Sequence, residues 1–431
     1  MALSTVLDDD RTNAATAWAL VAGLTLAAAV SLGFGEPLWS VLALAGVAVA
    51  VVPAVAYRDA SAMPPWEVLA VVAVPALLLA VGAPAAVTQA ASYLALAALA
   101  LLVVVELHVF SSVELTPRVA VALVVLLTMA ATGVWTVVRY AVATLLGTGF
   151  VGKVALMWDI TLATAVGVLA GGLAWAYLAS HESAGTAGFG VDDHAVAGGE
   201  DGTNGSDDEG VAEDDGDPDT DDDGDDRRGL MLAVRAMQVA LVGVTLFALV
   251  TFRWGLVINA GIPLAVTFLP GALERDVGLP MNAGLTAWIT LAVFLHAVGA
   301  LGPYQWFGWY DSVTHALSAS VVAGAGYASA RALDLHYDRL TVPPEFMFAF
   351  VVVFVLAFGV VWEVLEFASG GLSSLVGGEA VLAQYGARDI VLDLTFNTVG
   401  GVLVALFGTS RLRGVAGALA SSLGGRSAGR S

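Results

Sequence analysis

Residues 346–368 read FMFAFVVVFVLAFGVVWEVLEFA, an apolar run with no charge before Glu363. A run of this length is what an α-helix needs to cross the roughly 30 Å hydrocarbon core of a membrane. Similar runs recur along the whole 431-residue chain, in which 58% of residues are hydrophobic and 13% are charged. The sequence therefore predicts an all-α, polytopic transmembrane helix bundle of about twelve spans. The expected spans are residues 14–34, 38–57, 66–83, 92–110, 117–140, 154–179, 230–250, 254–269, 284–301, 311–333, 346–368 and 389–407.

An acidic tract divides these spans into two sets of six. Residues 182–228 hold 18 of the 38 acidic residues and only two arginines, so most of the net charge of −21 lies there. Such a Gly- and Asp-rich tract cannot bury apolar surface, and we expect it to be disordered. The expected organisation is a six-span bundle at 1–180, an acidic cytoplasmic linker at 181–228, a six-span domain at 229–410 and a cytoplasmic tail at 411–431. The many aspartates and the single lysine are typical of a halophilic protein.

Basic residues predict the orientation of the bundle. With twelve spans and a cytoplasmic N-terminus, thirteen of the seventeen basic residues fall on the inner side and four on the outer side. Loops rich in arginine and lysine stay cytoplasmic, so we expect a protein of the cell membrane with both termini on the cytoplasmic side. Residues 254–269 form the weakest span, because the run is short and contains Asn259 and Pro263. A re-entrant segment is the alternative there.

Pairs of ionisable residues mark three of the C-terminal spans. Within each pair the spacing is three or four, which places both side chains on one face of a helix. In the predicted orientation all three pairs lie toward the outer face, and ionisable groups inside a membrane usually mark a functional site. We therefore expect one polar constellation with its side-chain ends within about 10 to 12 Å of one another. Its members are Asp311 with His315, Glu363 with Glu366, Asp389 with Asp393, and His296 on a fourth span.

Five carboxylates brought together cannot all stay ionised, because two like charges 4 Å apart repel by about 4 kcal/mol at an effective dielectric near 20. One remedy is a divalent metal ion held by carboxylates and one or two imidazoles. The other remedy is protonation, with a proton relay such as transporters use. The residues alone do not choose between the two. The expected metal ligands are Asp311, His315, Glu363, Glu366, Asp389, Asp393 and His296. With no cysteine, the chain offers no thiolate ligand.

Two short motifs indicate that the first half is a degenerate copy of the second. The sequence WTVVRY at 135–140 parallels WEVLEF at 362–367, and DITLAT at 159–164 parallels DLTFNT at 393–398. Each match falls on the fifth or sixth span of its half, so the copies would be parallel and related by an axis near the membrane normal. In this alignment Thr136, Arg139 and Ala163 replace Glu363, Glu366 and Asn397.

The C-terminal motifs resemble those of the YjdF-like family of six-span inner-membrane proteins. The resemblance covers residues 230–407, and the expected Gln-Gly-Asp is present only as Gln384, because Tyr385 and Gly386 follow it and one acid is missing. The motifs are Leu295-His296, Tyr310-Asp311-Ser-Val-Thr-His315, Glu363-Val-Leu-Glu366 and Asp389-Ile-Val-Leu-Asp393. The VanZ-like membrane family, whose pattern has an Arg-x-Asp and an Asn-x-x-Gly, is similar around the adjacent Arg388 and Asp389 and around Asn397 and Gly400. Neither resemblance implies a settled reaction.

Three classes of function fit these residues. The first is a metal-dependent membrane enzyme acting on a lipid or lipid-linked phosphate, with His315 as a ligand or general acid/base and Arg388 as a phosphate contact. The second is a cation- or proton-coupled transporter, although its acids would be expected near the midplane. The third is a non-catalytic membrane factor with a structural cation. The expected partners are the lipid bilayer and a lipid or lipid-linked substrate, with no nucleic acid.

Overall fold

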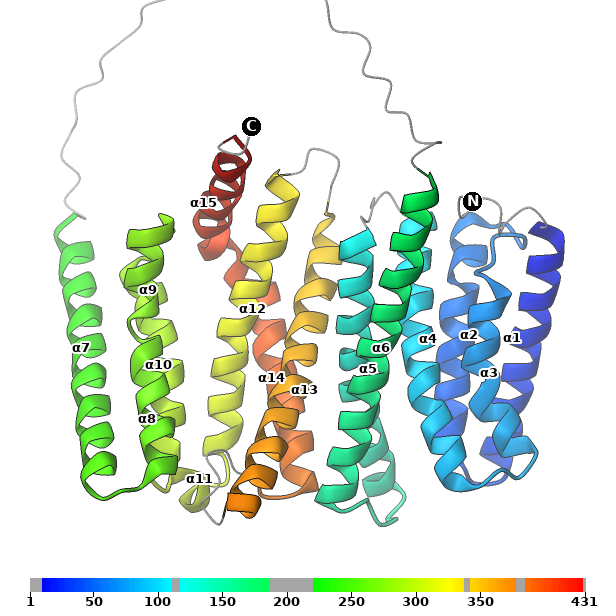
Figure 1. The fold of residues 1–431 in the computed structure, drawn as a ribbon, viewed down its shortest axis with the longest axis horizontal. Helices are drawn as coiled ribbons and strands as arrows, with labels where there is room; N and C mark the ends of the chain where they lie inside the picture. The colour runs from blue at the N-terminus through cyan, green and yellow to red at the C-terminus, as the bar shows by residue number, and fades with distance from the viewer. Residues whose placement is uncertain (1–9, 111–116, 186–219, 337–341, 377–383, 429–431) are drawn as a thin grey trace, which may run out of the picture.

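The fold is all-α, as the sequence predicts. The computed structural model describes residues 10–110, 117–185, 220–336, 342–376 and 384–428, and these form helices joined by short turns, with no strand among them. Nearly all of the long helices stand side by side in one layer-like bundle (Figure 1). The helices of the N-terminal half are α1 (Asp10–Gly33), α2 (Pro37–Tyr57), α3 (Trp66–Ala80), α4 (Ala85–Phe110), α5 (Pro117–Leu145) and α6 (Lys153–Gly185).

The C-terminal half contains seven longer helices and several short helical elements. Proline begins α13 as it begins α5, a position where its missing N–H costs no helical hydrogen bond. Asn282 caps α10 by accepting a hydrogen bond from the Leu285 amide at 2.9 Å. The elements are α7 (Thr220–Val250), α8 (Trp254–Val266), α9 (Leu269–Ala272), the π-helical segment Leu273–Val277, α10 (Ala283–Gly299), α11 (Pro303–Trp306), α12 (Tyr310–His336), α13 (Pro344–Val376), α14 (Ala387–Leu403), the π-helical segment Val404–Gly408 and α15 (Thr409–Ala428).

Nine helical segments of the described chain are long and apolar enough to cross a membrane. Helices α3 and α10 are apolar but shorter, and α12, whose sequence contains Asp311 and many small residues, is not among the nine. All three stand parallel to their neighbours in the bundle (Figure 1). The protein is therefore a multi-pass membrane protein, with fewer spans recognisable by composition than the twelve expected.

The helices differ from expectation in two segments, residues 254–269 and the acidic tract. The segment 254–269 is not re-entrant, because α8, α9 and the π-helical segment continue one another as a 24-residue span, Trp254–Val277. The acidic linker is shorter than 181–228, because α6 ends at Gly185 and α7 already begins at Thr220. Acidic residues favour the first turn of a helix, which explains why α7 begins inside the acidic tract. Residues 186–219 lie outside the described part of the chain.

Two more segments are helical where the sequence did not predict a helix: the C-terminal tail and the residues after Ala368. Most of the tail expected at 411–431 is the helix α15, which packs on α12. Helix α13 continues past Ala368 to Val376, so Glu363 and Glu366 lie within the helix and not at its end. The hydroxyl of Ser373 donates to the Gly370 carbonyl three residues earlier, which satisfies this polar residue inside the helix.

The two halves pack internally in the same order. Helix α1 contacts α2 and α3 as α7 contacts α8 and α10, and α4, α5 and α6 contact one another as α12, α13 and α14 do. The halves meet where α5 and α6 pack against α13 and α14, in the middle of the bundle (Figure 1). A shared apolar core fills this contact and includes Met157, Ile160, Val360, Ile390 and Leu394.

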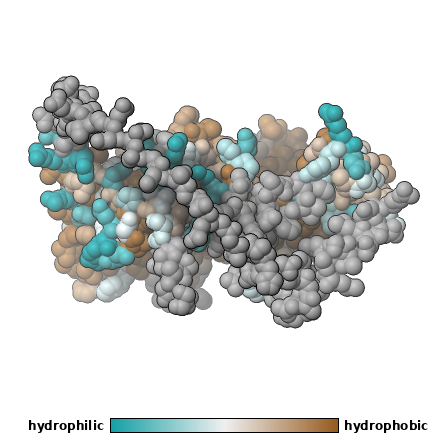
Figure 2. Space-filling model, turned by 90° about the horizontal axis from the view of Figure 1, so that it is seen from above, coloured by the Kyte–Doolittle hydropathy of each residue, from teal (hydrophilic) through white to brown (hydrophobic). Residues whose placement is uncertain are grey.

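Both ends of the described chain lie at one edge of the bundle, where α1 begins and α15 ends, and α11 lies at the opposite edge (Figure 1). In the view from above, hydrophobic residues appear along the sides of the bundle, and hydrophilic residues gather at the end facing the viewer (Figure 2). Large side chains such as Leu26, Val239 and Phe407 are 66%, 72% and 72% exposed. Exposed apolar sides and polar ends are the arrangement that a bilayer requires.

Candidate metal centre

The close approach of α12 and α14 positions the centre of the site. Gly400 on α14 lies over the main chain of α12, and a Cβ there would be 2.1 Å from the Ala316 carbonyl oxygen. Only glycine allows two helices to approach so closely, a packing mode common in membrane proteins. As a result, His315 of α12 reaches Asp393 and Asn397 of α14, which are two turns and one turn before Gly400, respectively.

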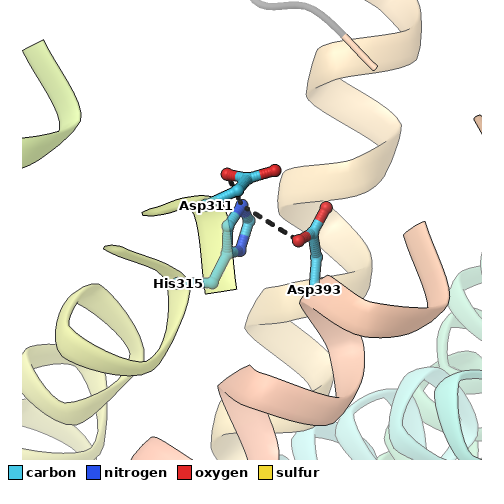
Figure 3. A group of neighbouring side chains, drawn as sticks. All are labelled: Asp311, His315 and Asp393. Carbon is cyan, nitrogen blue, oxygen red and sulfur yellow. Dashed lines mark ion pairs between the residues drawn. The ribbon is translucent and has the colours of Figure 1, made fainter. Parts of the chain in front are cut away.

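His315 lies between two carboxylates (Figure 3). Its Nε2 is 3.5 Å from Oδ1 of Asp311, one turn earlier on α12, and 3.7 Å from Oδ1 of Asp393. The side chain of Asp393 is only 4% exposed, that of His315 12% and that of Asp311 21%. One donor atom from each of the three residues lies within 4.8 Å of the others, so the three residues could bind a metal ion together.

The two ring nitrogens of His315 have different neighbours: Nδ1 lies next to Asn397, and Nε2 lies next to the two carboxylates. Asn397 Oδ1 is 3.3 Å from His315 Nδ1, a distance at which Nδ1–H donates to this carbonyl oxygen in one of the two neutral tautomers of the ring. In that tautomer, Nε2 is an unprotonated acceptor directed at the oxygens of Asp311 and Asp393. Acceptors facing one another repel unless a cation or a proton lies between them. The same arrangement, with the outer nitrogen hydrogen-bonded, orients metal-binding histidines.

Glu363 is the most deeply buried acid of the site. Its exposed fraction is 0%, and Gln384 Nε2 donates to its Oε2 at 2.7 Å and to its main-chain oxygen at 3.1 Å. The other oxygen, Oε1, is buried and has no hydrogen-bond partner among the residues that the structure describes. Its carboxyl interacts electrostatically with those of Glu366, Asp389 and Asp311, so it belongs to the same polar cluster. A buried oxygen without a partner is costly, and a proton, a water molecule or a cation would each lower that cost.

The remaining acids surround this centre. Glu366 is 7% exposed and accepts a hydrogen bond from Trp362 Nε1 at 2.9 Å on the same helix. Asp389, at the start of α14, accepts from the Tyr385 amide at 2.9 Å, and its carboxyl interacts with that of Asp311. The Asp393 carboxyl interacts with all four other acids. The ion pairs recorded for these five acids within the described residues all involve His315.

His296 and Arg388 lie at the margin of the site. Burial raises the pKa of the Tyr304 hydroxyl in α11 above its ordinary range, so this group stays protonated and can donate to His296 Nδ1, which is 2.9 Å away. The His296 ring also meets the Trp362 ring edge-on at 5.7 Å between centroids. His296 is thus held by aromatic neighbours and is not one of the three clustered donors. Arg388 is exposed, one residue before Asp389.

The structure brings together Asp311, His315 and Asp393 as the central group, with Glu363, Glu366 and Asp389 around them and His296 further out. The sequence motifs contain Asn397 and Gln384, but they did not predict which site residues these two contact. Asn397 follows Asp393 by one helical turn, so it lies on the same helix face as Asp389 and Asp393. Gln384 lies in the turn before α14, where no periodicity indicates that its amide reaches back to Glu363.

These helices and this buried site define a multi-pass membrane protein with an Asp/His cluster that could hold a metal ion. Residues 232–414 match the family described as Predicted membrane protein (DUF2238), and residues 1–63 match a Domain of unknown function (DUF8268). No curated protein and no solved structure matches the chain. The first match contains every helix that contributes to the site. It confirms a membrane-protein family over the C-terminal half, while the YjdF-like and VanZ-like resemblances stay predictions at that finer level.

Proposed function

We propose that this protein holds a divalent cation between Asp311, His315 and Asp393, and that the cation acts on the phosphate of a lipid or lipid-linked substrate. One observation carries the proposal. Three donor atoms lie within 4.8 Å of one another, and within the described part of the chain the buried Oε1 of Glu363 in the same cluster has no hydrogen-bond partner. A cation would compensate both the clustered negative charge and the unpartnered oxygen.

The donor chemistry supports a hard divalent ion such as Mg²⁺ or Mn²⁺. Two carboxylates and one imidazole leave coordination positions for water or a substrate oxygen. We assign His315 the tautomer in which Nδ1 donates to Asn397, and this assignment favours a metal over a shared proton because it leaves a lone pair on Nε2. When bound, such an ion polarises a phosphoryl oxygen and acidifies a bound water.

The position of the site supports a substrate from the membrane surface. Asp393 is the seventh residue of α14, which places it about 9 Å inside the helix end at a rise of 1.5 Å per residue. Arg388 is exposed at that end and can contact a phosphate bidentately. Trp306 at the end of α11 and Trp309 just before α12 are 68% and 62% exposed, as expected of aromatic residues at a headgroup boundary. A transporter site would be expected nearer the middle of the bilayer.

We further propose that the chain has twelve spans in two sets of six, with both termini cytoplasmic and the site on the extracytoplasmic side. Helices α3, α10 and α12 stand parallel to the nine candidate spans, which supports a total of twelve (Figure 1). The excess of basic residues on the side of the termini supports this orientation. The residue ranges 1–180 and 229–410 are the two proposed six-span units.

Metal content tests the proposal. The purified protein is equilibrated with Mn²⁺, and bound metal is measured for the wild type, Asp393→Asn and Glu345→Gln. Glu345 is an exposed glutamate on α13 at the far end from Glu363, so its variant controls for a lost charge. We expect about one Mn²⁺ per chain in the wild type and the control, and at least about tenfold weaker binding in Asp393→Asn. Equal binding in all three proteins would refute the site.

Turnover then tests the enzymatic part. Vesicles containing a lipid phosphate monoester are incubated with wild-type protein, and Mn²⁺-dependent release of inorganic phosphate is measured. We expect release to fall by at least about a hundredfold in Asp393→Asn, and by about tenfold in Arg388→Gln with metal content unchanged. Metal binding without any release would refute the enzyme and leave a structural cation. Uptake of Mn²⁺ into sealed vesicles would instead identify a transporter.

A further inference from the structure

The N-terminal half contains a second buried polar cluster, on α4, α5 and α6. Asp159 Oδ2 accepts hydrogen bonds from Gln89 Nε2 at 3.0 Å and from Arg139 Nη1 at 3.1 Å. The side chains of Arg139 and Asp159 are only 13% and 24% exposed. Gln89 also donates to the Tyr93 hydroxyl at 3.1 Å, and Tyr93 is almost fully buried. The cluster therefore pairs one acid with one guanidinium and two neutral groups.

The residues of this cluster correspond in position to those of the candidate metal centre. Helices α5 and α13 both begin with proline, and the same offset of 227 residues aligns Arg139 with Glu366. Helices α6 and α14 begin 234 residues apart, and that offset aligns Asp159 with Asp393. On α4, Gln89 and Tyr93 are spaced by four, as Asp311 and His315 are on α12.

The packing supports the same correspondence. In each half, the three helices that carry the cluster contact one another, and α5 contacts α13 at the junction between the halves. The contact of α5 with α14 has its counterpart in the contact of α6 with α13. This is the pattern of a two-fold axis that runs along the helices between α5 and α13. At the edge of the bundle opposite to the start of α1, helices α4, α6, α12 and α14 begin and helices α5 and α13 end (Figure 1).

We infer that the two halves are parallel copies, and that the guanidinium of Arg139 fills the place in the N-terminal copy that the cation fills in the C-terminal copy. The inference rests on the proposed cation site. In the N-terminal copy, Asp159 is neutralised within the chain by Arg139. In the C-terminal copy five acids converge, and the ion pairs recorded for them involve only His315. The N-terminal copy therefore needs no cation to neutralise its acid, and the C-terminal copy is the one that binds the cation.

Glu366→Arg tests this inference, because it places a guanidinium at the position equivalent to Arg139. Glu366→Gln is the matched control, since it removes the same charge without adding a cation. Each full-length protein is purified in detergent, its Mn²⁺ content is measured, and its thermal unfolding midpoint is recorded in EDTA and in Mn²⁺. We expect Glu366→Arg to bind at least about tenfold less Mn²⁺ than Glu366→Gln and to have a midpoint that no longer responds to Mn²⁺.

The midpoint in EDTA separates this inference from the proposed cation site. A guanidinium beside Asp393 should stabilise the cluster whether metal or protons neutralise it in the wild type. We therefore expect the midpoint of Glu366→Arg in EDTA to exceed that of Glu366→Gln by at least about 2 °C. A wild-type protein without any Mn²⁺ response would refute the cation site alone. A lower EDTA midpoint for Glu366→Arg than for Glu366→Gln, or an unchanged Mn²⁺ content, would overturn the equivalence of Arg139 and Glu366.

Discussion

Adding one methyl group at Gly400 should both destabilise the protein and weaken its metal site. The Cβ of Gly400→Ala would be 2.1 Å from the Ala316 carbonyl oxygen and 3.1 Å from the Ser320 amide nitrogen, whereas ordinary contact begins at 3.4 Å. Both neighbours are main-chain atoms of α12, so no side chain can rotate away. The two helices must separate by about 1 Å to remove the overlap.

The magnitude follows from two opposing effects. Overpacking of a close contact typically costs about 1–3 kcal/mol. Replacing glycine by alanine inside a helix gains about 0.5–1 kcal/mol, because alanine loses less backbone entropy on folding. We expect Gly400→Ala to be about 1–2 kcal/mol less stable than the wild type. A separation of about 1 Å also draws His315 away from Asp393, so we expect Mn²⁺ affinity to fall at least about tenfold.

Gly172→Ala is the matched control. Gly172 is also a helical glycine, on α6, but it is exposed and nothing lies within 4 Å of its added Cβ. This variant should keep wild-type Mn²⁺ affinity and unfold at the same temperature or slightly higher. Thermal unfolding in detergent and Mn²⁺ titration report the two effects separately. If Gly400→Ala behaved like Gly172→Ala in both measurements, the close approach of α12 and α14 would be wrong.

Three further outcomes are expected. Asn397→Leu removes the acceptor that orients the imidazole, and Mn²⁺ affinity should fall by about 10–100-fold while the helical content measured by circular dichroism stays constant; undiminished affinity would contradict the assigned tautomer. Gln384→Leu removes the donor to Glu363 and should lower the free energy of unfolding in EDTA by about 1–3 kcal/mol, which denaturant titration can measure, and an unaffected stability would count against this hydrogen bond. In the cysteine-free chain, Thr148→Cys should react with a membrane-impermeant thiol reagent in intact cells and Ser61→Cys should not, because they lie at opposite edges of the bundle; the reverse labelling would invert the proposed orientation.

The N-terminal half also supports the site directly across the junction of the halves. Lys153 Nζ donates to the main-chain oxygen of Gln384 at 2.9 Å, and Met157 Sδ is 3.4 Å from the Gln384 amide nitrogen. Gln384 in turn holds Glu363. Residues of α6 therefore position an acid of the C-terminal cluster through one intermediate side chain. This contact gives the N-terminal half a positioning role even though its own polar cluster is closed by an ion pair.

The sequence by itself determined the class of protein and the residues of the centre. Apolar runs such as 346–368 must be helices in a bilayer, because only a helix satisfies every backbone hydrogen bond within one segment. The spacing of Asp311 with His315 and of Asp389 with Asp393 placed each pair on one helix face, since that follows from local geometry alone. These inferences needed no knowledge of how the helices pack.

Tertiary structure alone decided which of these residues meet. His315 reaches Asp393 because Gly400 lets α12 and α14 approach, and His296 stays apart because Tyr304 holds its ring. Contacts between residues far apart in the sequence depend on side-chain packing between helices, which no periodicity encodes. The same reason explains why the contact of Gln384 with Glu363 was not predicted and why α13 continues beyond Ala368. Local pattern fixes the face that a residue presents, and packing decides what that face contacts.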